Sequence, residues 1–349
     1  MRLNSAAIKD SVLILNKFDN LPDEYTPGLV DAYMKSPDHP VAKLRPGDVD
    51  EALARQDCWV WLHLDLIDQR AQNWVSQRCD LPYAVQSVLE GHDDSLVVGH
   101  EFGTLHGVIA DMHHDIERTS TTIGRLHFIL TDRLLVTGRR HPLEAMDHVR
   151  NSLATGFCPS TPYELFEAVV STFCKNTAKR LNQASKLLDS VEDRLVSERF
   201  NDERRDLKKV RRLAVSLHRP VAGMVALFEE EDRLGWALSG SAHAVLKRLF
   251  LRLERLDREI VMVNDRARLL QDEIASELAD DSNRSLKVMA VVSARLLPGT
   301  LIAGIFGMNT AGLPFTSQSS GFGWAVVTGV AATGVSYWFL RRAGISLKL

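Results

Sequence analysis

The sequence has few features of a secreted, redox-active or nucleic-acid-binding protein. Its 349 residues include only four cysteines, Cys58, Cys79, Cys158 and Cys174, and no CxxC pair, which argues against a disulfide scaffold or a zinc finger. The net charge of -3 gives no basic surplus for nucleic acid. The first residues, MRLNSAAIKDSV, lack the apolar segment of a signal peptide, so we expect the amino terminus to stay in the cytosol.

The sequence also lacks the motifs of common enzymes. It contains no P-loop, GxGxxG, GxSxG or HExxH pattern, so no standard nucleotide or hydrolase site is predicted. With 45% hydrophobic and 25% charged residues, the composition is that of an ordinary folded chain. We expect neither enzymatic activity nor a resident cofactor.

Hydrophobic residues are instead concentrated near the carboxyl terminus. The stretch Phe322–Leu340 holds nineteen residues without a charge. As a helix it would be about 29 Å long, the thickness of a bilayer's hydrocarbon core. Tyr337 and Trp338 near its end, followed by Arg341 and Arg342, are typical of a membrane interface. A membrane span is therefore favoured over a buried core helix.

Another hydrophobic stretch, Leu286–Met308, lies before Phe322–Leu340 in the sequence and would be the first of two spans. Lys287 and Arg295 interrupt it, and Pro298 would damage an ordinary soluble helix. Membrane helices tolerate such a proline where neighbouring helices satisfy the freed backbone group. Since only the part beyond Arg295 is strictly apolar, we expect Arg295 to mark the cytoplasmic boundary of the membrane.

Charges flanking the two spans predict their orientation. The connection 309–321 carries no charge, whereas basic residues lie before and after the pair of spans. These are Arg284, Lys287 and Arg295 on one side, and Arg341, Arg342 and Lys348 on the other. By the positive-inside rule both termini are cytoplasmic and the connection faces outward. Two helices per chain cannot enclose a pathway, so transport would require an oligomer.

A heptad pattern precedes the membrane segments. Apolar residues fill two positions of each heptad, a and d. One position holds Leu246, Leu253, Ile260, Ala267 and Ile274, and the other holds Leu249, Leu256, Val263 and Leu270. This pattern predicts one helix from about His243 to Asn309, roughly 100 Å long. Tyr163–Ser197 and Asn201–Glu231 are predicted as helices that flank it, the second with a kink at Pro220.

Strand and helix signals are mixed before residue 160. Strands are predicted at Trp59–Leu66, Thr104–Met112, Arg125–Leu130 and Arg133–Thr137, and helices at Gln69–Gln77 and Leu143–Leu153. The predicted sheet is appreciably antiparallel. We thus expect an α+β cytosolic αβα domain at 1–160, a helical stalk at 161–285 and a two-helix transmembrane domain at 286–349.

The end of the first span carries the tripeptide Gly307-Met308-Asn309, within GIFGMNTAGLPF. This resembles the signature of the CorA family of divalent-cation transporters, and LKVMAVVSARLLPGTLIAGIFGMN resembles that family's pore helix. The neutral residues 310–314 depart from the acidic loop of its magnesium members. They are similar to the loop of the zinc-transporting ZntB branch, as is LHFILTDRLLVTGRRHPLEAMDHVR at 126–150.

The resemblance implies a pentameric funnel in the cytoplasmic membrane, with the GMN motif as selectivity filter at the outer mouth. It implies Zn²⁺ as the cargo, with Mg²⁺, Co²⁺ or Ni²⁺ transport as the alternative. The sequence leaves open whether transport is channel-like or coupled to protons. The pore face of the first span has no Asp, Glu or His, so a proton relay would need another location.

The chemistry of the mouth follows from helix physics. Unpaired carbonyls give a helix carboxyl terminus partial negative charge, and several such ends around an axis would attract cations. The Asn309 amide oxygen can accept hydrogen bonds from the water shell of a divalent ion. A helix cap is the alternative role for Asn309.

Projecting the first span at about 100° per residue predicts its pore face. The predicted pore-lining residues are Asn283, Met289, Ser293, Leu297, Thr300 and Gly304. The family resemblance maps constrictions onto Asn309, Thr300, Leu297, Met289 and Asn283. Leu297 and Met289 would act as hydrophobic gates that close by dewetting, although a stripe of Leu and Met can also be ordinary packing.

Two clusters in the amino-terminal part are candidate metal ligands, His92-Asp93-Asp94 and His113-His114-Asp115. Exposed polar loops are the alternative. His63 and His127 alternate within predicted strands and are expected in the sheet.

Two other classes of protein remain open. A membrane-anchored coiled-coil scaffold would carry no ion and would not need Asn309. A membrane-attached metalloenzyme would lose turnover on His113→Ala.

Overall fold

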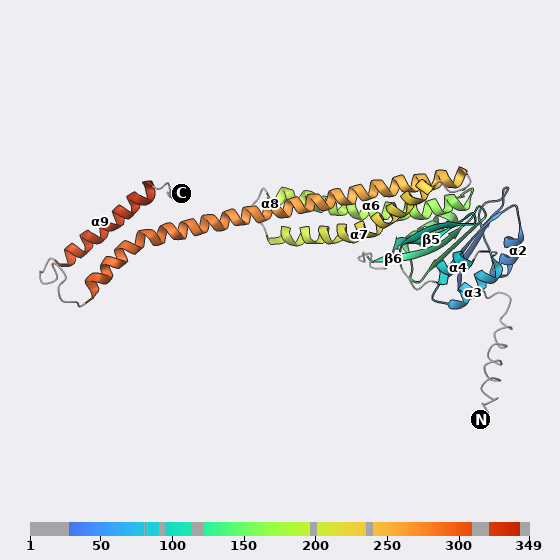
Figure 1. Cartoon of the computed structure of the whole chain (residues 1–349), viewed down its shortest axis with the longest axis horizontal. Coiled ribbons are helices and arrows are strands. Elements are labelled where there is room, and N and C mark those ends of the chain that lie inside the picture. Colours follow the sequence, from blue (N-terminus) through green and yellow to red (C-terminus); the bar gives the residue numbers. More distant parts are fainter. Residues whose placement is uncertain are drawn as a thin grey trace, which may run out of the picture. The chain divides into compact units, whose positions relative to one another are not determined.

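The structure is a computed structural model that describes residues 28–79, 81, 83–90, 95–113, 122–195, 201–234, 240–308 and 321–342. It divides into two units, Met1–Arg268 and Leu269–Leu349. Helix α8 (Gly240–Gly307) contributes residues to both units (Figure 1). Each unit is described by itself.

A mixed sheet forms the centre of the first unit. Its seven described strands are β1 (Leu29–Lys35), β2 (Ala42–Lys43), β3 (Trp59–Asp65), β4 (Val97–Glu101), β5 (Thr104–Met112), β6 (Ile123–Leu130) and β7 (Leu134–Arg139). They lie in the order β2-β1-β3-β7-β6-β5-β4. Among these strands, β3 and β7 pair in parallel and the other neighbours pair antiparallel. The predicted antiparallel character is confirmed.

Helices cover both faces of the sheet. One face carries η1 (Pro46–Asp48), α2 (Val49–Ala54), α3 (Gln69–Arg78) and α4 (Tyr83–Glu90), and the other carries α5 (Glu144–Ala154) and α6 (Pro162–Leu195). Successive side chains of β6 point to opposite faces of the sheet. Phe128 packs against Phe166 with ring centroids 4.5 Å apart, whereas Ile129 packs into the core on the other face. The predicted αβα arrangement is therefore present.

Three long helices extend from this core: α6, α7 (Asn201–Leu234) and α8. Arg248 of α8 binds Glu167 of α6 at 2.6 Å, and further along both helices Arg266 binds Asp189 at 2.7 Å and also Glu192. The two helices thus run parallel. The carboxylates raise the pKa of the Arg266 guanidinium above its usual value.

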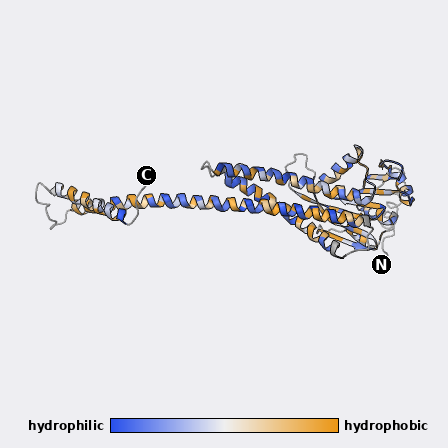
Figure 2. Ribbon diagram, turned by 90° about the horizontal axis from the view of Figure 1, so that it is seen from above, coloured by the Kyte–Doolittle hydropathy of each residue, from blue (hydrophilic) through white to orange (hydrophobic). Residues whose placement is uncertain are grey.

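The heptad positions of α8 are buried, except Val263, which is half-buried. Leu249, Leu253, Ile260 and Ala267 have no exposed side-chain surface. Hydrophilic and hydrophobic segments alternate along the helices of the first unit, as expected when each helix buries one stripe (Figure 2).

Most of the predicted elements are present. The strands and helices expected between residues 59 and 153 occur within two residues of their predicted bounds, and α8 is one helix of 68 residues. Strands β1 and β4 and helices α2 and α4 were not predicted. Helix α7 continues through Pro220. The three-part division at residues 160 and 285 stays a prediction; its second boundary falls inside α8.

A buried polar network joins the two parallel strands. Thr137 Oγ1 accepts hydrogen bonds from Trp61 Nε1 and His63 Nδ1, both at 2.8 Å, and donates to the carbonyl of Leu62. Arg139 Nε donates to His63 Nε2 at 3.1 Å, so the imidazole is held neutral. Burial, aided by the positive Arg139, lowers the pKa of His63 to about 3.

This network predicts acid sensitivity of the sheet. An unfolded His63 gains a proton below about pH 6.5, whereas the folded one stays neutral until about pH 3. Folded stability should therefore fall as pH drops through this window, by up to about 1.4 kcal/mol per pH unit from this one group. Hydrogen exchange of β3 and β7 amides in the full chain, corrected for intrinsic rates, should show a shallower pH slope for His63→Asn. The exposed His148→Asn is the control, and equal slopes in all three proteins would contradict the assignment.

Candidate functional site

Two described helices are long and apolar enough to cross a membrane. The qualifying stretches are Ala242–Gly307 of α8 and Phe322–Arg342 of α9 (Gly321–Arg342). Helix α8 ends at Gly307, and Met308 N–H donates to the carbonyl of Ile305 at 3.4 Å. The helix therefore ends within the GMN motif, as predicted, although Asn309 lies outside the described residues.

The predicted pore face is exposed within one chain. Asn283, Met289, Ser293, Leu297, Thr300 and Gly304 are all exposed, and Met289 and Leu297 reach 68% and 62%. Apolar side chains exposed to this extent need a lipid or protein partner.

Helix α9 packs on the other side of α8. The Arg295 guanidinium lies 4.8 Å from the centre of the Tyr337 ring, and Ser336 Oγ donates to the carbonyl of Ala294 at 2.9 Å. Further along, a Cβ at Gly299 would lie 3.5 Å from Thr333 Oγ1. Helix geometry places Arg295 and Gly299 about 160–200° from Leu297 around α8. Arg295 therefore faces away from the predicted pore, as expected.

An apolar cavity of about 870 Å³ lies between α8 and α9. Small residues form much of its wall, including Gly299, Ala303, Ala325 and Gly329. Such residues let membrane helices approach closely.

Two glycines on α8 have no packing role among the residues that the structure describes. A Cβ added at Gly304 or Gly307 would meet nothing within 4 Å, and neither residue has the positive φ that favours glycine. Neither internal crowding nor backbone strain therefore requires glycine at these positions. Close approach of a neighbouring molecule is a physical reason that remains.

The hydroxyl of Thr300 is oriented by its own helix. Thr300 Oγ1 donates to the carbonyls of Leu296 at 3.1 Å and Leu297 at 3.0 Å. With the proton directed into the helix, the oxygen lone pairs remain able to accept hydrogen bonds at the exposed face.

Of the predicted metal ligands, the structure describes His113. It directly follows β5 and forms an isolated bridge with Leu143. Gly124 leaves room for its ring, because a Cβ there would lie 2.5 Å from His113 Cδ2. Burial and the neighbouring His141 lower the pKa of His113. His92, Asp93, His114 and Asp115 lie outside the described residues.

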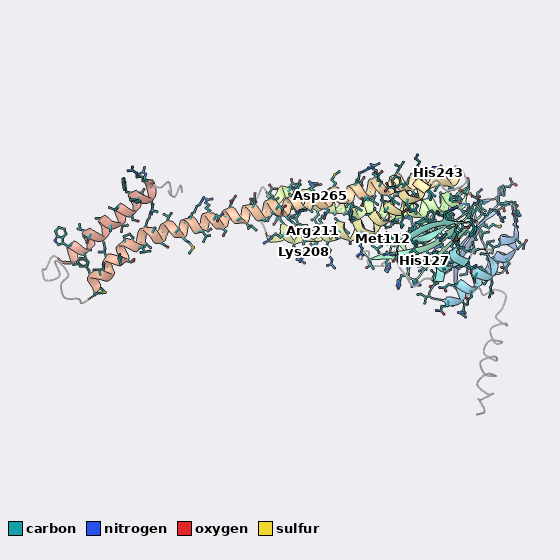
Figure 3. The ribbon with its side chains drawn as sticks, viewed as in Figure 1. Met112, His127, Lys208, Arg211, His243 and Asp265 are labelled. Carbon is teal, nitrogen blue, oxygen red and sulfur yellow. The ribbon has the colours of Figure 1, made fainter. Side chains whose placement is uncertain are left out.

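His141 was not predicted as a partner of His113. Their ring centroids are 5.1 Å apart, and both rings line a cavity of about 240 Å³ at one end of the sheet. His127 of β6 also lines this cavity. Strand β6 pairs with β5, which ends at Met112 (Figure 3). The described residues contain no group of three or more His, Cys, Asp or Glu placed to hold a metal.

Asp111 fixes the helix that follows His141. Its carboxylate accepts hydrogen bonds from the backbone N–H of Met112 at 2.7 Å and of Ala145 at 3.1 Å. It thereby caps α5, whose own preceding residue, Leu143, has no side-chain acceptor. Burial raises the pKa of Asp111 to about 8.

Comparisons with known proteins agree with this architecture. The family model described as "CorA-like Mg2+ transporter protein" matches residues 56–342. The zinc transport protein ZntB of Yersinia enterocolitica is 26% identical over 302 residues, or 82% of this chain and 88% of that protein. The divalent cation transporter CmaX of Pseudomonas aeruginosa is 22% identical over 81% of this chain and 86% of its own length.

Solved structures show the same fold. Full-length CmaX matches with a TM-score of 0.76 and 19% identity, covering 91% of this chain and 98% of that chain. The CorA magnesium transporter from Methanocaldococcus jannaschii matches with a TM-score of 0.71 and 15% identity, covering 91% and 99%. The predicted fold class, an αβα domain with long helices and two candidate membrane helices at the carboxyl terminus, is confirmed.

The packing of α9 on α8 can be tested at Tyr337. Tyr337→Ala removes the ring under Arg295 and should lower the free energy of unfolding by about 1 kcal/mol, measured on the full chain by titration from mild detergent into SDS. Tyr337→Phe keeps the ring and should stay near the parent value. Equal losses from both substitutions would show that the ring contact does not stabilise the pair.

Proposed function

Because the chain belongs to the family of CorA-like magnesium transporters and thus to the divalent-cation transporters, we propose that it forms a homo-oligomeric pore for Zn²⁺ lined by α8. The observation that carries this proposal is the asymmetry of α8. Contacts with Arg295 and Gly299 place α9 on one side, while Leu297 and Thr300 stand exposed on the other. A ring of such helices would direct the exposed faces to a common axis.

The outer mouth of the pore would attract the ion, and the part of the pore lined by α8 would control its passage. Carbonyls at the end of α8 supply partial negative charge, and Asn309 would add amide oxygens for the water shell. Thr300 adds a hydroxyl oxygen oriented to accept hydrogen bonds. The side chains of Leu297 and Met289 would close the shaft by excluding water. An inside-negative potential favours entry by about 2.3 kcal/mol per charge per 100 mV.

Zinc is proposed because of the ZntB relative and the neutral loop after the GMN motif. The CorA neighbour is named for magnesium, which keeps Mg²⁺, with Co²⁺ and Ni²⁺, as the second candidate. Coupling to protons would need groups outside the first span, since residues 286–308 contain no Asp, Glu or His. Family membership favours transport over the scaffold and the metalloenzyme.

The assembly and orientation are proposed on the same basis. A pentamer in the cytoplasmic membrane would bring five GMN motifs together, with both chain termini in the cytosol. The open space around Gly304 and Gly307 supports close approach between chains. The basic residues flanking the spans support the orientation.

The metal site predicted at His113 is proposed here with His141 as its second ligand. Two imidazoles on one tetrahedral zinc would have ring centres about 5 Å apart, because Zn–N bonds are about 2.0 Å long. The observed separation is 5.1 Å. Water or further side chains would complete the coordination.

Transport is tested first at Asn309. Full-length protein in proteoliposomes should lose most Zn²⁺ uptake on Asn309→Ala, about tenfold or more, because the amide oxygens at the mouth are removed. Gln318→Ala removes an amide from the same connection and should leave uptake unchanged. Competition by Mg²⁺, Co²⁺ and Ni²⁺ in this assay identifies the preferred ion. Unchanged uptake for assembled Asn309→Ala protein would refute the role of the motif.

The His113 site is tested by binding rather than by flux. Calorimetric titration of the detergent-solubilised full chain with Zn²⁺ should show one site fewer per chain in both His113→Ala and His141→Ala. The exposed His148→Ala should retain the parent stoichiometry. The same stoichiometry in all four proteins would remove this site from the proposal.

A further inference from the structure

The hydrogen bonding of α8 has a gap inside its membrane-spanning segment. Pro298 lies within the helix and has no N–H. In a regular helix the N–H of residue 298 would donate to the carbonyl of Ala294, four residues earlier. Hydrocarbon offers no replacement partner, so this carbonyl must be satisfied by protein.

Helix α9 supplies the missing donor. Ser336 Oγ donates to the Ala294 carbonyl oxygen at 2.9 Å. The other two aliphatic hydroxyls of α9 in the described residues bond within their own helix. Thr328 Oγ1 donates to the carbonyls of Trp324 and Ala325, and Thr333 Oγ1 donates to the carbonyl of Gly329. Ser336 is thus matched to the acceptor that Pro298 leaves open.

The contact lies directly behind the predicted gate. Leu297 immediately precedes Pro298 and is 62% exposed on the opposite side of α8. Next to Ser336, Tyr337 stacks against Arg295. This turn of α8 is therefore fixed from behind by two adjacent residues of α9, while its front carries the side chains proposed to line the pore.

We propose that Ser336 is a positioning residue for transport. Its hydrogen bond replaces the one that Pro298 cannot make and holds this turn of α8 so that Leu297 and Thr300 face the pore axis. The inference rests on the proposed pore, and it adds a residue outside the pore to the groups that set the rate of transport.

Uptake of Zn²⁺ into proteoliposomes tests this role in the assembled full chain. Ser336→Ala should lower the maximal rate about three- to twentyfold, the range that corresponds to one hydrogen bond between membrane helices. The half-saturating Zn²⁺ concentration should not change, because the mouth is intact. Ser336→Thr keeps the hydroxyl and should restore the rate. Thr328→Val, which removes a hydroxyl bonded within α9, is the matched control.

The decisive arm is Pro298→Ala. Alanine restores the N–H of residue 298, so the Ala294 carbonyl regains a partner within α8. In this background Ser336→Ala should change the rate less than about twofold. An equal loss from Ser336→Ala in the parent and in the Pro298→Ala protein, or no loss in either, would overturn the proposal.

Four of these proteins should also be unfolded by SDS titration: the parent, Ser336→Ala, Pro298→Ala and the variant with both substitutions. The effect of Ser336→Ala on the unfolding midpoint should again depend on Pro298, which tests the hydrogen bond without reference to transport. If the parent protein transports no divalent cation, the proposed pore itself is refuted. A conducting parent with additive effects in both assays would refute only the role of Ser336.

Discussion

The second unit depends on the need of a membrane helix to satisfy its own backbone while keeping one face free. Helix α8 meets this need over most of its membrane segment with bonds between its own turns. The exception is at Pro298, where Ser336 of α9 takes the place of the missing donor. The contacts with α9 that satisfy this carbonyl also occupy one side of α8, and the other side is exposed among the described residues.

That division gives the residues of α8 different physical tasks. Arg295 and Gly299 meet α9, the first through the Tyr337 ring and the second by leaving room for Thr333. Leu297 and Thr300 meet no such partner in the described chain and carry the proposed gate and hydroxyl acceptor. Uncharged oxygens suit a divalent ion that keeps its water shell, because they orient water without holding the ion too tightly to leave.

The first unit obeys a different constraint, since its sheet and the helices that cover it bury polar groups that must find partners. Some of its buried polar side chains lie in the sheet, as in the neutral His63 bonded to Thr137, and others lie in α6 and α7, such as Thr177 and Glu203. The histidine pair at the sheet's end differs, because His113 and His141 line a cavity. Arginine–carboxylate pairs such as Arg248 with Glu167 fix α8 along α6.

The length of the uncharged stretches predicted the membrane spans. Periodicity predicted the heptad seam of α8 and the face that carries Leu297 and Thr300, because a helix converts spacing in sequence into position around an axis. Strands such as β5 were predictable for the same local reason. Strand β1 was not predicted, since it pairs with β3, which lies beyond α2 in the sequence. Strand β4 was missed as well, although it forms a hairpin with the strand that follows it, β5. Only the tertiary structure brought His141 to His113 and Ser336 to Ala294, because a contact between residues distant in sequence is decided by how elements pack.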